Sequence, residues 1–543
     1  MINFNFTNLF LDGVKYAQDF HERSLLFWKV MSERGDNYLD HRVHKPPVVT
    51  FQYKIIKDGQ SCKKRTNYSL FRILTNSSIE HHPERRPIVI IDPRAGHGPG
   101  IGGSKLESEV GMALQLGHPV YFIMFHPDPI PNQTLADIAD AEIEFLEEVI
   151  RRHPDLPKPA VIGNCQAGWA SAILATERPE LVSNLFLNGA PLSYWAGQRG
   201  KNPMRYRGGL NGGSWSASFL ADLGNGVFDG AHLVDGFERL NPANTHWSKL
   251  YKLFAKVDTE RQRFLDFEKW WGGFYFMTKK EIRQIVEDLF VGNKLERGKF
   301  HLRKNKKPVD LKNITANIVI FCSEGDNITP PAQALQWIPA IYKDVQEMKQ
   351  MKKRIIFCVH PKIGHLGIFV GAAIANIQHR EIIGRLRDYD KMPYGLWEMK
   401  IPEDGTCAWV EERTFDDLKK YGVSFEDYPA FEKMLALSEK NQVVYDRLLH
   451  PLVRAISNSV TWNIVRFSHP LRVQRYAFSR LNPATPLIRQ MAEYVDKNRK
   501  VVGEENVWRR LETVFANVVE ENLRYWGNMR DSLQEAAFWK MFG

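Results

Sequence analysis

The amino-acid sequence predicts an α/β protein with a mostly parallel central sheet, a helical insertion and a mainly helical C-terminal region. From residue 87 onward, short apolar runs alternate with stretches of helical spacing, which is the pattern of a parallel sheet flanked by helices. This alternation stops at residue 191 and resumes at about residue 312. The 543 residues are 43% hydrophobic and 25% charged, a composition that excludes disordered and collagen-like chains.

Residues 1–86 are predicted to form an N-terminal extension. Apolar residues recur at helical spacing over Leu11–Arg34, and the segment Val48–Ile56 alternates like an edge strand. The start of the chain has no basic segment followed by an apolar one, so we expect no signal peptide and a cytoplasmic location. The longest strongly apolar stretch, Gly367–Ala375, is far shorter than the roughly 20 residues of a transmembrane helix, so we expect no transmembrane segment.

The first part of the core is predicted over residues 87–190. Its strands are short, fully apolar runs, as in strands that a parallel sheet buries on both faces. We expect strands at Pro87–Asp92, Val120–Phe125, Ala160–Gly163 and Val182–Leu187, and helices at Ser104–Leu116, at Thr134–Arg152 and from about Gln166.

Residues 191–311 interrupt this pattern and are predicted to form a cap over an active site. The segment begins with many glycines and arginines and continues as helical, aromatic sequence, as a lid would. The sheet resumes at Ile318–Cys322 and Arg354–Val359, which places the second part of the core at residues 312–380. Residues 381–543 are predicted to be mainly helical. One amphipathic face in that region is marked by Leu511, Val514, Phe515, Val518 and Val519.

The charged residues and the cysteines narrow the possible functions. A net charge of +10 suits anionic substrates such as CoA thioesters, but no basic helix with interleaved aromatic residues indicates nucleic-acid binding. The five cysteines are scattered and odd in number, so we expect neither a disulfide framework nor a structural zinc site. We expect no cofactor and no metal ion.

A candidate nucleophile lies between a predicted strand and a predicted helix, in the segment Gly163–Gly168. Gly163 and Ala167 fit the sharp turn that exposes a nucleophile, because larger side chains two positions away would collide. The apex is Cys165, where the N-terminus of the helix favours a thiolate. The backbone N–H of Gln166 is then a candidate donor to an oxyanion. The alternative is a buried structural cysteine in a strand–helix turn.

A candidate acid and a candidate base follow two later strands. Asp326 stands in a glycine-containing turn, and His365 stands in a loop with a glycine before it, while His360 is the weaker rival as base. Taken singly, Asp326 is more often a turn residue and a loop histidine a surface residue. The chain order of nucleophile, acid and base is that of the triad in α/β-hydrolases. We therefore predict an α/β-hydrolase fold with a Cys165–Asp326–His365 triad that transfers acyl groups through a covalent thioester.

The loop after the first core strand allows two interpretations. The glycines of residues 96–103 fit G-x-G-x-x-G, with Asp128 as a ribose ligand, which would indicate a dinucleotide site. However, these glycines begin several residues past the strand and Pro99 lies among them. The favoured interpretation is that His97 and Gly98 bring a second backbone N–H to the oxyanion.

Several segments match the motifs of one enzyme family. The segment Gly163–Gly168 matches its Gly-x-Cys-Gln-Gly-Gly elbow, with Ala167 in place of one glycine, and Gly364–Gly367 matches its Gly-His-x-Gly. Asn327–Pro331 departs from the His-x-Val-Pro that usually follows the acid. Further matches are Leu240–Pro242, Asp258–Arg261, Glu268–Trp270, Asn293–Gly298 and Val309–Thr315. Over roughly residues 87 to 380, the chain resembles the polyhydroxyalkanoate (polyester) synthases, and it looks like a synthase-like branch with extra N- and C-terminal regions.

The resemblance implies an acyltransferase that acts on 3-hydroxyacyl-CoA. In that family's mechanism, Cys165 would hold the acyl group, His365 would take the thiol proton and then activate a hydroxyl, and Asp326 would orient His365 or assist the hydroxyl. A polyester granule surface, a second subunit or a homodimer are the further partners that this resemblance suggests.

Three residues of the insertion are candidates for binding the substrate. Arg205 and Arg207 could contact CoA phosphates, because guanidinium groups match phosphate geometry. The alternative for both is a lid segment with solvated charges. Trp270 lies in one of the cap segments that match the synthases, and we expect it to contact the substrate.

Two other functions fit the same sequence. A hydrolase with a cysteine nucleophile, either an intracellular polyester depolymerase or an acyl-CoA thioesterase, would pass the acyl group to water. A non-catalytic protein that binds a granule or a partner would use the helical C-terminal region and the basic surface instead.

Overall fold

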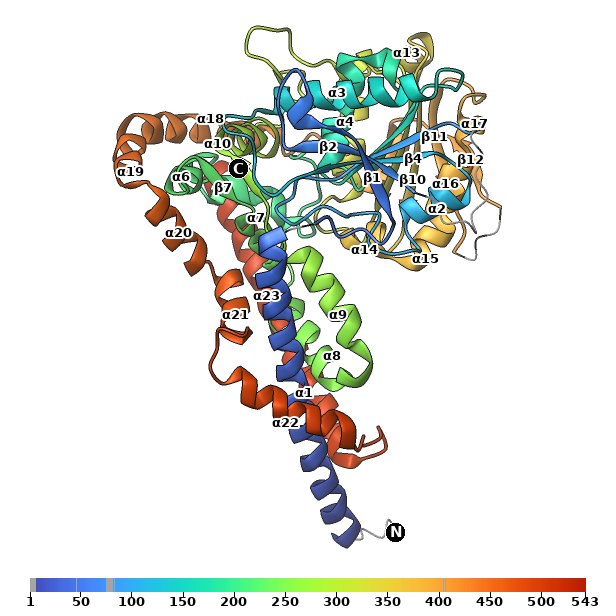
Figure 1. Ribbon diagram of the computed structural model, residues 1–543. Coiled ribbons are helices and arrows are strands. Elements are labelled where there is room, and N and C mark those ends of the chain that lie inside the picture. The colour runs from blue at the N-terminus through green and yellow to red at the C-terminus, as the bar shows by residue number, and fades with distance from the viewer. Residues whose placement is uncertain (1–5, 45, 75–81, 83, 404, 406) are drawn as a thin grey trace.

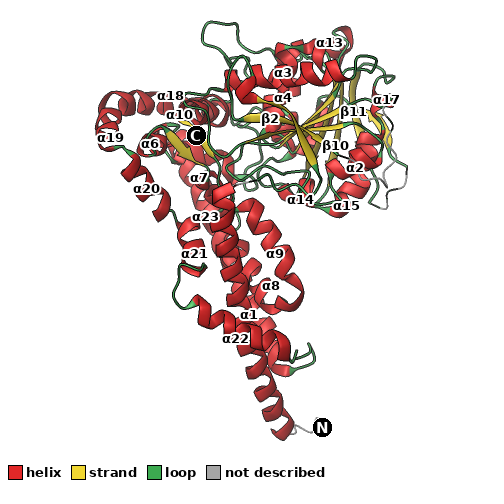
Figure 2. Ribbon diagram, in the orientation of Figure 1, coloured by secondary structure: helices red, strands yellow, loops and turns green. Residues whose placement is uncertain are grey.

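The structure is a computed structural model that describes residues 6–44, 46–74, 82, 84–403, 405 and 407–543. Within these residues, ten strands form one sheet in the order β1-β2-β4-β3-β5-β6-β9-β10-β11-β12. Helices cover both faces of the sheet, and helical segments from both ends of the chain form an arm that extends away from it (Figure 1). The strands gather at the wide end of the molecule, whereas the labelled elements of the arm are helices joined by loops (Figure 2).

The sheet is parallel in its centre and antiparallel at its edges. The strands from β4 to β11 along the sheet are parallel to one another, whereas β1, β2 and β12 pair antiparallel. This is the α/β-hydrolase fold class that the sequence predicted. The strands are β1 (Tyr53–Asp58), β2 (Tyr68–Ile73), β3 (Ile88–Ile91), β4 (Val120–Phe125), β5 (Ala160–Asn164), β6 (Asn184–Asn188), β9 (Asn317–Ser323), β10 (Arg354–His360), β11 (Gly395–Lys400) and β12 (Trp409–Glu412).

The central strands separate two layers of apolar packing. Ile88 and Ile90 of β3 face the layer that contains helix α2, whereas Val89 and Ile91 face the layer that contains α3 and α4. Because successive side chains of a strand point to opposite faces, a strand buried on both sides must be apolar throughout. The helices nearest these strands are α2 (Glu109–Gln115), α3 (Leu135–Arg152) and α4 (Ala167–Glu177).

Helix α3 begins where the sequence supplies a strong start signal. The hydroxyl of Thr134 accepts a hydrogen bond from the backbone N–H of Asp137, and the Asp137 carboxylate accepts one from the N–H of Thr134. This reciprocal capping satisfies two backbone donors that a helix start otherwise leaves unpaired.

The insertion predicted as a cap lies between β6 and β9. It contains helices and one short pair of antiparallel strands. These elements are α5 (Arg207–Leu210), α6 (Trp215–Leu223), β7 (Val227–Asp229), α7 (Ala231–Glu238), α8 (Lys249–Ala255), α9 (Val257–Trp271), β8 (Phe276–Thr278) and α10 (Lys279–Gln284).

After β9, short helices complete the core and longer ones form the arm. The core helices are α11 (Pro331–Leu335), α12 (Trp337–Ile341), α13 (Val345–Gln350), α14 (His365–Val370), α15 (Ala372–Ile374), α16 (Arg380–Gly384) and α17 (Leu386–Tyr389). The C-terminal helices are α18 (Tyr428–Val444), α19 (His450–Ile456), α20 (Ser459–Ser468), α21 (Pro470–Phe478), α22 (Thr485–Asn498) and α23 (Val507–Phe542). The N-terminal helix α1 (Phe6–His44) packs against α9, α21, α22 and α23.

Buried ion pairs fasten the arm together. Arg23 of α1 donates to Asp19 at 2.7 Å and to Glu512 of α23 at 2.6 Å. Arg472 of α21 pairs with Asp229 of the insertion at 2.7 Å. Helix α1, the insertion and the helices from α21 to α23 are therefore parts of one packed structure.

The structure differs from the expected elements in several places. The expected edge strand over Val48–Ile56 begins later, as β1, because the N–H groups of Val48 and Thr50 donate to the carbonyls of Pro99 and Gly103 instead of to a strand. Strand β2 lies in a segment for which no strand was expected, so part of the predicted extension belongs to the central sheet. The expected face of Leu511, Val514, Phe515 and Val518 is largely exposed on α23.

No helix among the described residues is long and apolar enough to span a lipid bilayer.

Candidate active site

Cys165 occupies a sharp turn between β5 and α4. Its backbone is in the left-handed region with φ of 50°, which a residue with a side chain adopts only under strain. A Cβ on Gly163 would lie 2.7 Å from the carbonyl oxygen of Ala167, and one on Gly168 would lie 2.1 Å from the Cβ of Ala190. The turn therefore requires glycine at both positions, as a nucleophile elbow does.

Asp326 and His365 meet Cys165 at the same edge of the sheet. The Nε2 atom of His365 lies 3.2 Å from the Sγ of Cys165, and its Nδ1 lies 2.7 Å from the Oδ2 of Asp326. The other carboxylate oxygen of Asp326 accepts hydrogen bonds from the backbone N–H groups of Ile328 and Thr329, both at 2.8 Å. The structure thus brings together the three residues that the sequence singled out, each at the carboxyl end of its own strand.

The environment of His365 favours its protonated form. Burial opposes the charge, but the carboxylate of Asp326 and the sulfur of Cys165 outweigh it and raise the pKa of His365 to about 10. Cys165, Asp326 and His365 are 5%, 2% and 6% exposed, so little solvent screens this interaction. A protonated imidazole beside the sulfur stabilises a thiolate, which is the reactive form of cysteine.

His97 lies on the other side of His365, in the loop that follows β3. Burial lowers the pKa of His97 to about 4 against the effect of the Gly98 carbonyl, and the nearby His365 acts in the same direction as burial. The neutral ring donates from Nδ1 to the carbonyl oxygen of Gly98 over 2.8 Å. Its Nε2 therefore carries no proton, so an oxyanion donor in this loop has to be a backbone N–H.

Asp92, at the end of β3, holds this loop in shape. Its Oδ2 accepts hydrogen bonds from the backbone N–H groups of Gly100 and Ile101. Burial raises the pKa of Asp92 well above its usual range, although the two N–H groups oppose the shift. Sequence analysis passed over Asp92, but its place directly after an apolar strand is a signal that could have identified it.

The sequence suggested Gln166, His97 and Gly98 as sources of backbone donors to an oxyanion, and of these three Gln166 lines the cavity together with Cys165. Gln166 is the first residue after the elbow and caps α4. In the part of the chain that the structure describes, the N–H groups of Gln166 and Gly98 have no hydrogen-bond acceptor. Both donors remain candidates for an oxyanion.

Glu109 is a second buried carboxylate near the elbow that the sequence did not single out. Its two oxygens accept hydrogen bonds from the side-chain amides of Asn164 at 2.7 Å and Asn188 at 2.6 Å. Burial raises the pKa of Glu109, while His379 and the two amides oppose the shift. Asn164 directly precedes Cys165, so Glu109 holds the ends of β5 and β6 in register beneath the elbow.

An apolar cavity of about 280 Å³ opens beside Cys165 and Gln166. The insertion forms most of its wall, and the elbow, the loop after β9 and helix α11 supply the remainder through residues such as Ile328 and Gln333. Its apolar lining includes Tyr194, Met204, Ala217, Leu220, Phe228, Leu233, Phe237, Val286, Phe290 and Val291. A cavity of this kind can hold a short acyl chain next to the sulfur.

Arg205 and Arg207 lie on the wall of this cavity, but both already have partners. Arg205 is buried and pairs with Asp427 at 2.6 Å, and it also donates to the hydroxyl of Tyr206. Arg207 donates to the carbonyl oxygen of Gly236 at 2.6 Å. Arg205 thus connects the insertion to the C-terminal region, a contact that sequence analysis did not foresee.

Trp270 does not line the cavity at Cys165. Its ring lies 4.5 Å from that of His97 and forms part of a separate cavity of about 670 Å³. Basic residues contribute to that second cavity, namely Lys105, Lys249, Lys252, Arg263 and Lys269.

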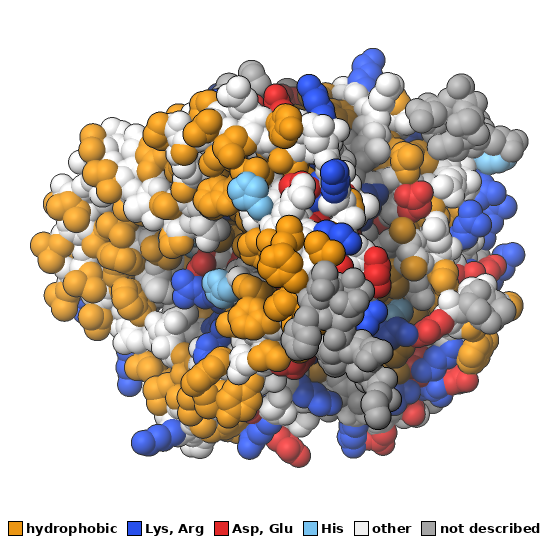
Figure 3. Space-filling model, turned by 90° about the horizontal axis from the view of Figure 1, so that it is seen from below, with side chains coloured by type: hydrophobic (Ala, Val, Ile, Leu, Met, Phe, Trp, Pro, Cys, Tyr) orange, Lys and Arg blue, Asp and Glu red, His pale blue; other side chains and the backbone are white. Residues whose placement is uncertain are grey.

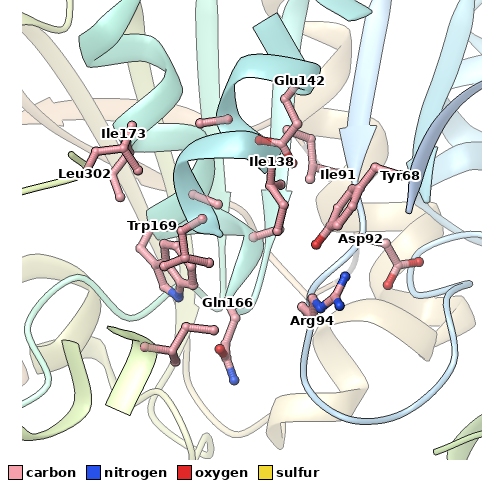
Figure 4. A pocket seen from close by; sticks show the side chains of 15 residues that line it. Tyr68, Ile91, Asp92, Arg94, Ile138, Glu142, Gln166, Trp169, Ile173 and Leu302 are labelled. Atoms are coloured by element: carbon pink, nitrogen blue, oxygen red, sulfur yellow. The ribbon is translucent and has the colours of Figure 1, made fainter. Parts of the chain in front are cut away.

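A third, much smaller cavity of about 40 Å³ lies behind the elbow, between α3 and α4 (Figure 4). Arg94 and Asp92 lie on one side of it and Trp169 on the other, with Gln166 at its lower end. Arg94 pairs with the buried Glu281 at 3.2 Å. This cavity is too small for a substrate, and Gln166 is the residue that it shares with the cavity beside Cys165.

Among the described residues, no three His, Cys, Asp or Glu side chains are grouped so that they could hold a metal ion.

The central sheet, the elbow and the buried cysteine, histidine and aspartate define a protein of the α/β-hydrolase class. More narrowly, the chain belongs to the family described as "Protein of unknown function (DUF3141)", which matches residues 19–543.

Among individual proteins, a relative that matches nearly the whole of this chain is accompanied by more distant, partial relatives. An "Uncharacterized protein in ackA 5'region" of Rhizobium meliloti is 43% identical over 547 residues, which cover 98% of this chain and 74% of that protein. The poly(3-hydroxyalkanoate) polymerase subunit PhaC of Synechocystis sp. is 26% identical over 233 residues, which cover 42% of this chain and 60% of PhaC. The carboxylesterase CesB of Bacillus subtilis aligns in structure with a TM-score of 0.36 at 11% identity, over 65% of this chain and 98% of CesB.

Proposed function

We propose that this protein is an acyltransferase in which Cys165 takes the acyl group of a 3-hydroxyacyl-CoA and passes it to a hydroxyl acceptor. The observation that carries this proposal is the continuous contact from Asp326 through His365 to the sulfur of Cys165, which ends at an apolar cavity. The similarity to the PhaC subunits supports the choice of a hydroxyacyl substrate.

The first half-reaction would load the acyl group onto the enzyme. The thiol proton of Cys165 moves to Nε2 of His365, and the sulfur attacks the thioester carbonyl carbon. The carbonyl oxygen becomes an oxyanion, which the N–H groups of Gln166 and Gly98 would stabilise. When this intermediate collapses, the bond to the CoA sulfur breaks, the proton on His365 passes to that sulfur, and an acyl thioester remains on Cys165.

The second half-reaction would transfer the acyl group to an alcohol. A hydroxyl of another hydroxyacyl group gives its proton to His365, and its oxygen attacks the acyl carbon on Cys165. The bond to the Cys165 sulfur breaks, the sulfur takes the proton back, and an ester has formed. If water enters in place of the hydroxyl, the same residues release a free hydroxy acid, and the protein is a hydrolase.

The test is the release of CoA from 3-hydroxybutyryl-CoA by the purified protein, with the products separated into oligomers and free acid. We expect CoA release with oligomeric product for the wild type and none for Cys165→Ala. Cys407→Ala is the matched control, because Cys407 is exposed and lies outside the cavity, and it should release CoA like the wild type.

The other outcomes are equally informative. Free acid alone, still dependent on Cys165, would replace the transferase by a thioesterase. Turnover that is equal in Cys165→Ala would remove Cys165 as nucleophile. A folded wild-type protein without turnover on hydroxyacyl-CoA substrates of several chain lengths would favour the non-catalytic alternative.

A further inference from the structure

The outer faces of α19 and α20 expose rows of apolar side chains. Leu452 and Ile456 of α19 are 67% and 61% exposed, and Val460 and Ile464 of α20 are 64% and 62% exposed. Leu448 and Leu449, just before α19, and Phe467 near the end of α20 extend these rows. An exposed apolar surface of this extent in a folded protein marks a place where something binds.

The opposite faces of the same helices pack on the protein. Both helices contact α6 of the insertion, and the ring of Trp462 lies 5.4 Å from that of Phe276. Val453 is buried. The exposed rows therefore form the outer side of two helices that are packed on the insertion. They lie at the side of the molecule where α19 and α20 are labelled in Figure 1 and where many apolar side chains gather in Figure 3.

The stretch of chain that contains α19 and α20 carries only positively charged side chains, apart from histidine. Between residues 447 and 492 the sequence contains no Asp or Glu, although it contains seven arginines. The four arginines from Arg472 to Arg489 each pair with a carboxylate on another element, namely Asp229, Glu268, Asp40 and Asp36.

The remaining three arginines lie beside the apolar rows without a carboxylate. Arg454 donates to the amide oxygen of Asn225, and Arg466 donates to that of Asn463. Arg447 is exposed. In the described part of the chain, none of these three pairs with an acidic side chain. Arg447 and Arg454 are exposed, so their charge is available to an anionic partner, whereas the guanidinium of Arg466 is half-buried over the rings of Trp462 and Phe467.

We infer that the outer faces of α19 and α20 form a docking surface for an anionic phospholipid membrane. Helices that lie in a lipid surface bury an apolar face among the acyl chains and place arginines at the level of the headgroups, and the charge attracts them to anionic lipids. This surface combines both features, and the helices would lie along the membrane without crossing it.

Two other partners fit the surface less well. In a two-fold pairing of this surface with a second copy, the same unpaired arginines would meet each other in an apolar contact. Nucleic acid would match the arginines through its phosphates, but it would leave the apolar rows exposed to water.

The test is co-sedimentation of the full-length protein with vesicles of phosphatidylcholine alone and of phosphatidylcholine mixed with phosphatidylglycerol. We expect binding to the anionic vesicles that weakens as salt is added, and little binding to the neutral ones. Leu452→Asp/Ile464→Asp should lower partitioning on the order of a hundredfold, because two apolar side chains no longer enter the lipid. Arg454→Gln should lower it about fivefold.

The matched control is Leu511→Asp/Phe515→Asp, which makes the same kind of change at two exposed positions of α23. It should bind vesicles like the wild type, and circular dichroism should show all variants to be folded.

An equal loss of vesicle binding in this control would assign the binding to the helical arm as a whole and overturn the proposal. Equal binding to neutral vesicles would overturn it in favour of any uncharged apolar surface, such as a polyester particle. A dimer in size-exclusion chromatography that only Leu452→Asp/Ile464→Asp dissociates, without vesicle binding, would overturn it in favour of a second copy.

Discussion

The Nε2 atom of His365 lies 3.2 Å from the Sγ of Cys165, although 200 positions separate the two residues in the chain. The contact arises because both residues follow parallel strands, whose carboxyl ends lie at one edge of the sheet. The imidazole contacts the cysteine with one nitrogen and the aspartate with the other, so the protonated ring can donate one N–H to each.

Replacing Cys165 should abolish acyl transfer without unfolding the protein. Cys165→Ala removes the sulfur that would carry the acyl group, and we expect turnover to fall by about 10⁴-fold or more. Cys165→Ser keeps the shape, but a hydroxyl beside His365 is a weaker nucleophile than a thiolate. CoA release measures both variants, and trapping of an acyl group on the wild type, seen by mass spectrometry, identifies the atom that carries it.

The Asp326–His365 pair should make stability depend on pH above neutrality. The pKa of His365 is raised from 6.5 to about 10, so its contribution is fully present below pH 6.5 and is lost as the pH rises through 10. Asp326→Asn removes the carboxylate that holds the proton. The difference in unfolding free energy between wild type and Asp326→Asn should therefore be largest at about pH 6 and shrink toward about pH 10, as measured by urea unfolding. A difference that grows with pH would contradict the assignment.

Filling the cavity beside Cys165 should change the preference for acyl chain length. Ala217 of α6 lines the cavity, and Ala217→Leu would occupy part of it. We expect kcat/KM to fall about 10- to 100-fold for long acyl chains and to change little for short ones, because only the long chains need that space. The short substrate is the internal control. A uniform loss for all chain lengths would mean that the cavity does not receive the acyl chain.

Removing Glu109 should destabilise the elbow. Glu109→Ala removes the acceptor of the Asn164 amide, at a cost of about 1–3 kcal/mol for the unpaired group. The Asn188 amide keeps its 3.3 Å hydrogen bond to Oδ1 of Asn164. Urea unfolding measures the loss. Glu107→Ala, at an exposed position two residues earlier, is the control and should stay within about 0.5 kcal/mol of the wild type. If the two variants are equally stable, the hydrogen bonds of Glu109 do not support the elbow.

The two arginines of the cavity wall should behave differently. Arg205→Gln breaks the buried pair with Asp427 and should lower the unfolding free energy by about 3 kcal/mol or more. Arg207→Gln keeps a polar side chain and should instead raise the KM for acyl-CoA about tenfold, if the guanidinium binds a phosphate. An unchanged KM for Arg207→Gln would remove the proposed phosphate contact.

The sequence predicted the residues of the candidate site more fully than the contacts between the elements that surround the site. Cys165, Asp326 and His365 each follow an apolar run, so their order along the chain was sufficient to group them. For Arg205 the sequence suggested a CoA-phosphate contact or a solvated lid residue. It did not reveal the ion pair with Asp427, because Asp427 lies 222 positions away in a region without recognisable motifs. Long-range ion pairs of this kind leave no periodic signal in a sequence.

Edge strands and exposed helix faces were the least predictable parts of the fold. Strand β2 contains Arg72 within its apolar run, and the guanidinium lies over the ring of Tyr121 on the next strand, which no local pattern reveals. The apolar row on α23 has the spacing of a buried face, yet Leu511 and Phe515 are 53% and 63% exposed. Helical spacing identifies an apolar side, but not what covers it.

The contact between Arg23 and Glu512 has a consequence for the order in which the protein is made. The two residues are 489 positions apart, and a ribosome that adds about 5–20 residues per second needs roughly 25–100 seconds to reach the second one. During that interval α1 has emerged but α23 does not yet exist. Asp19, one turn before Arg23 on the same helix and 2.7 Å from it, is already there to neutralise the charge. The helix that is synthesised first thus carries its own counter-ion before the last helix arrives, and it keeps that counter-ion in the folded protein.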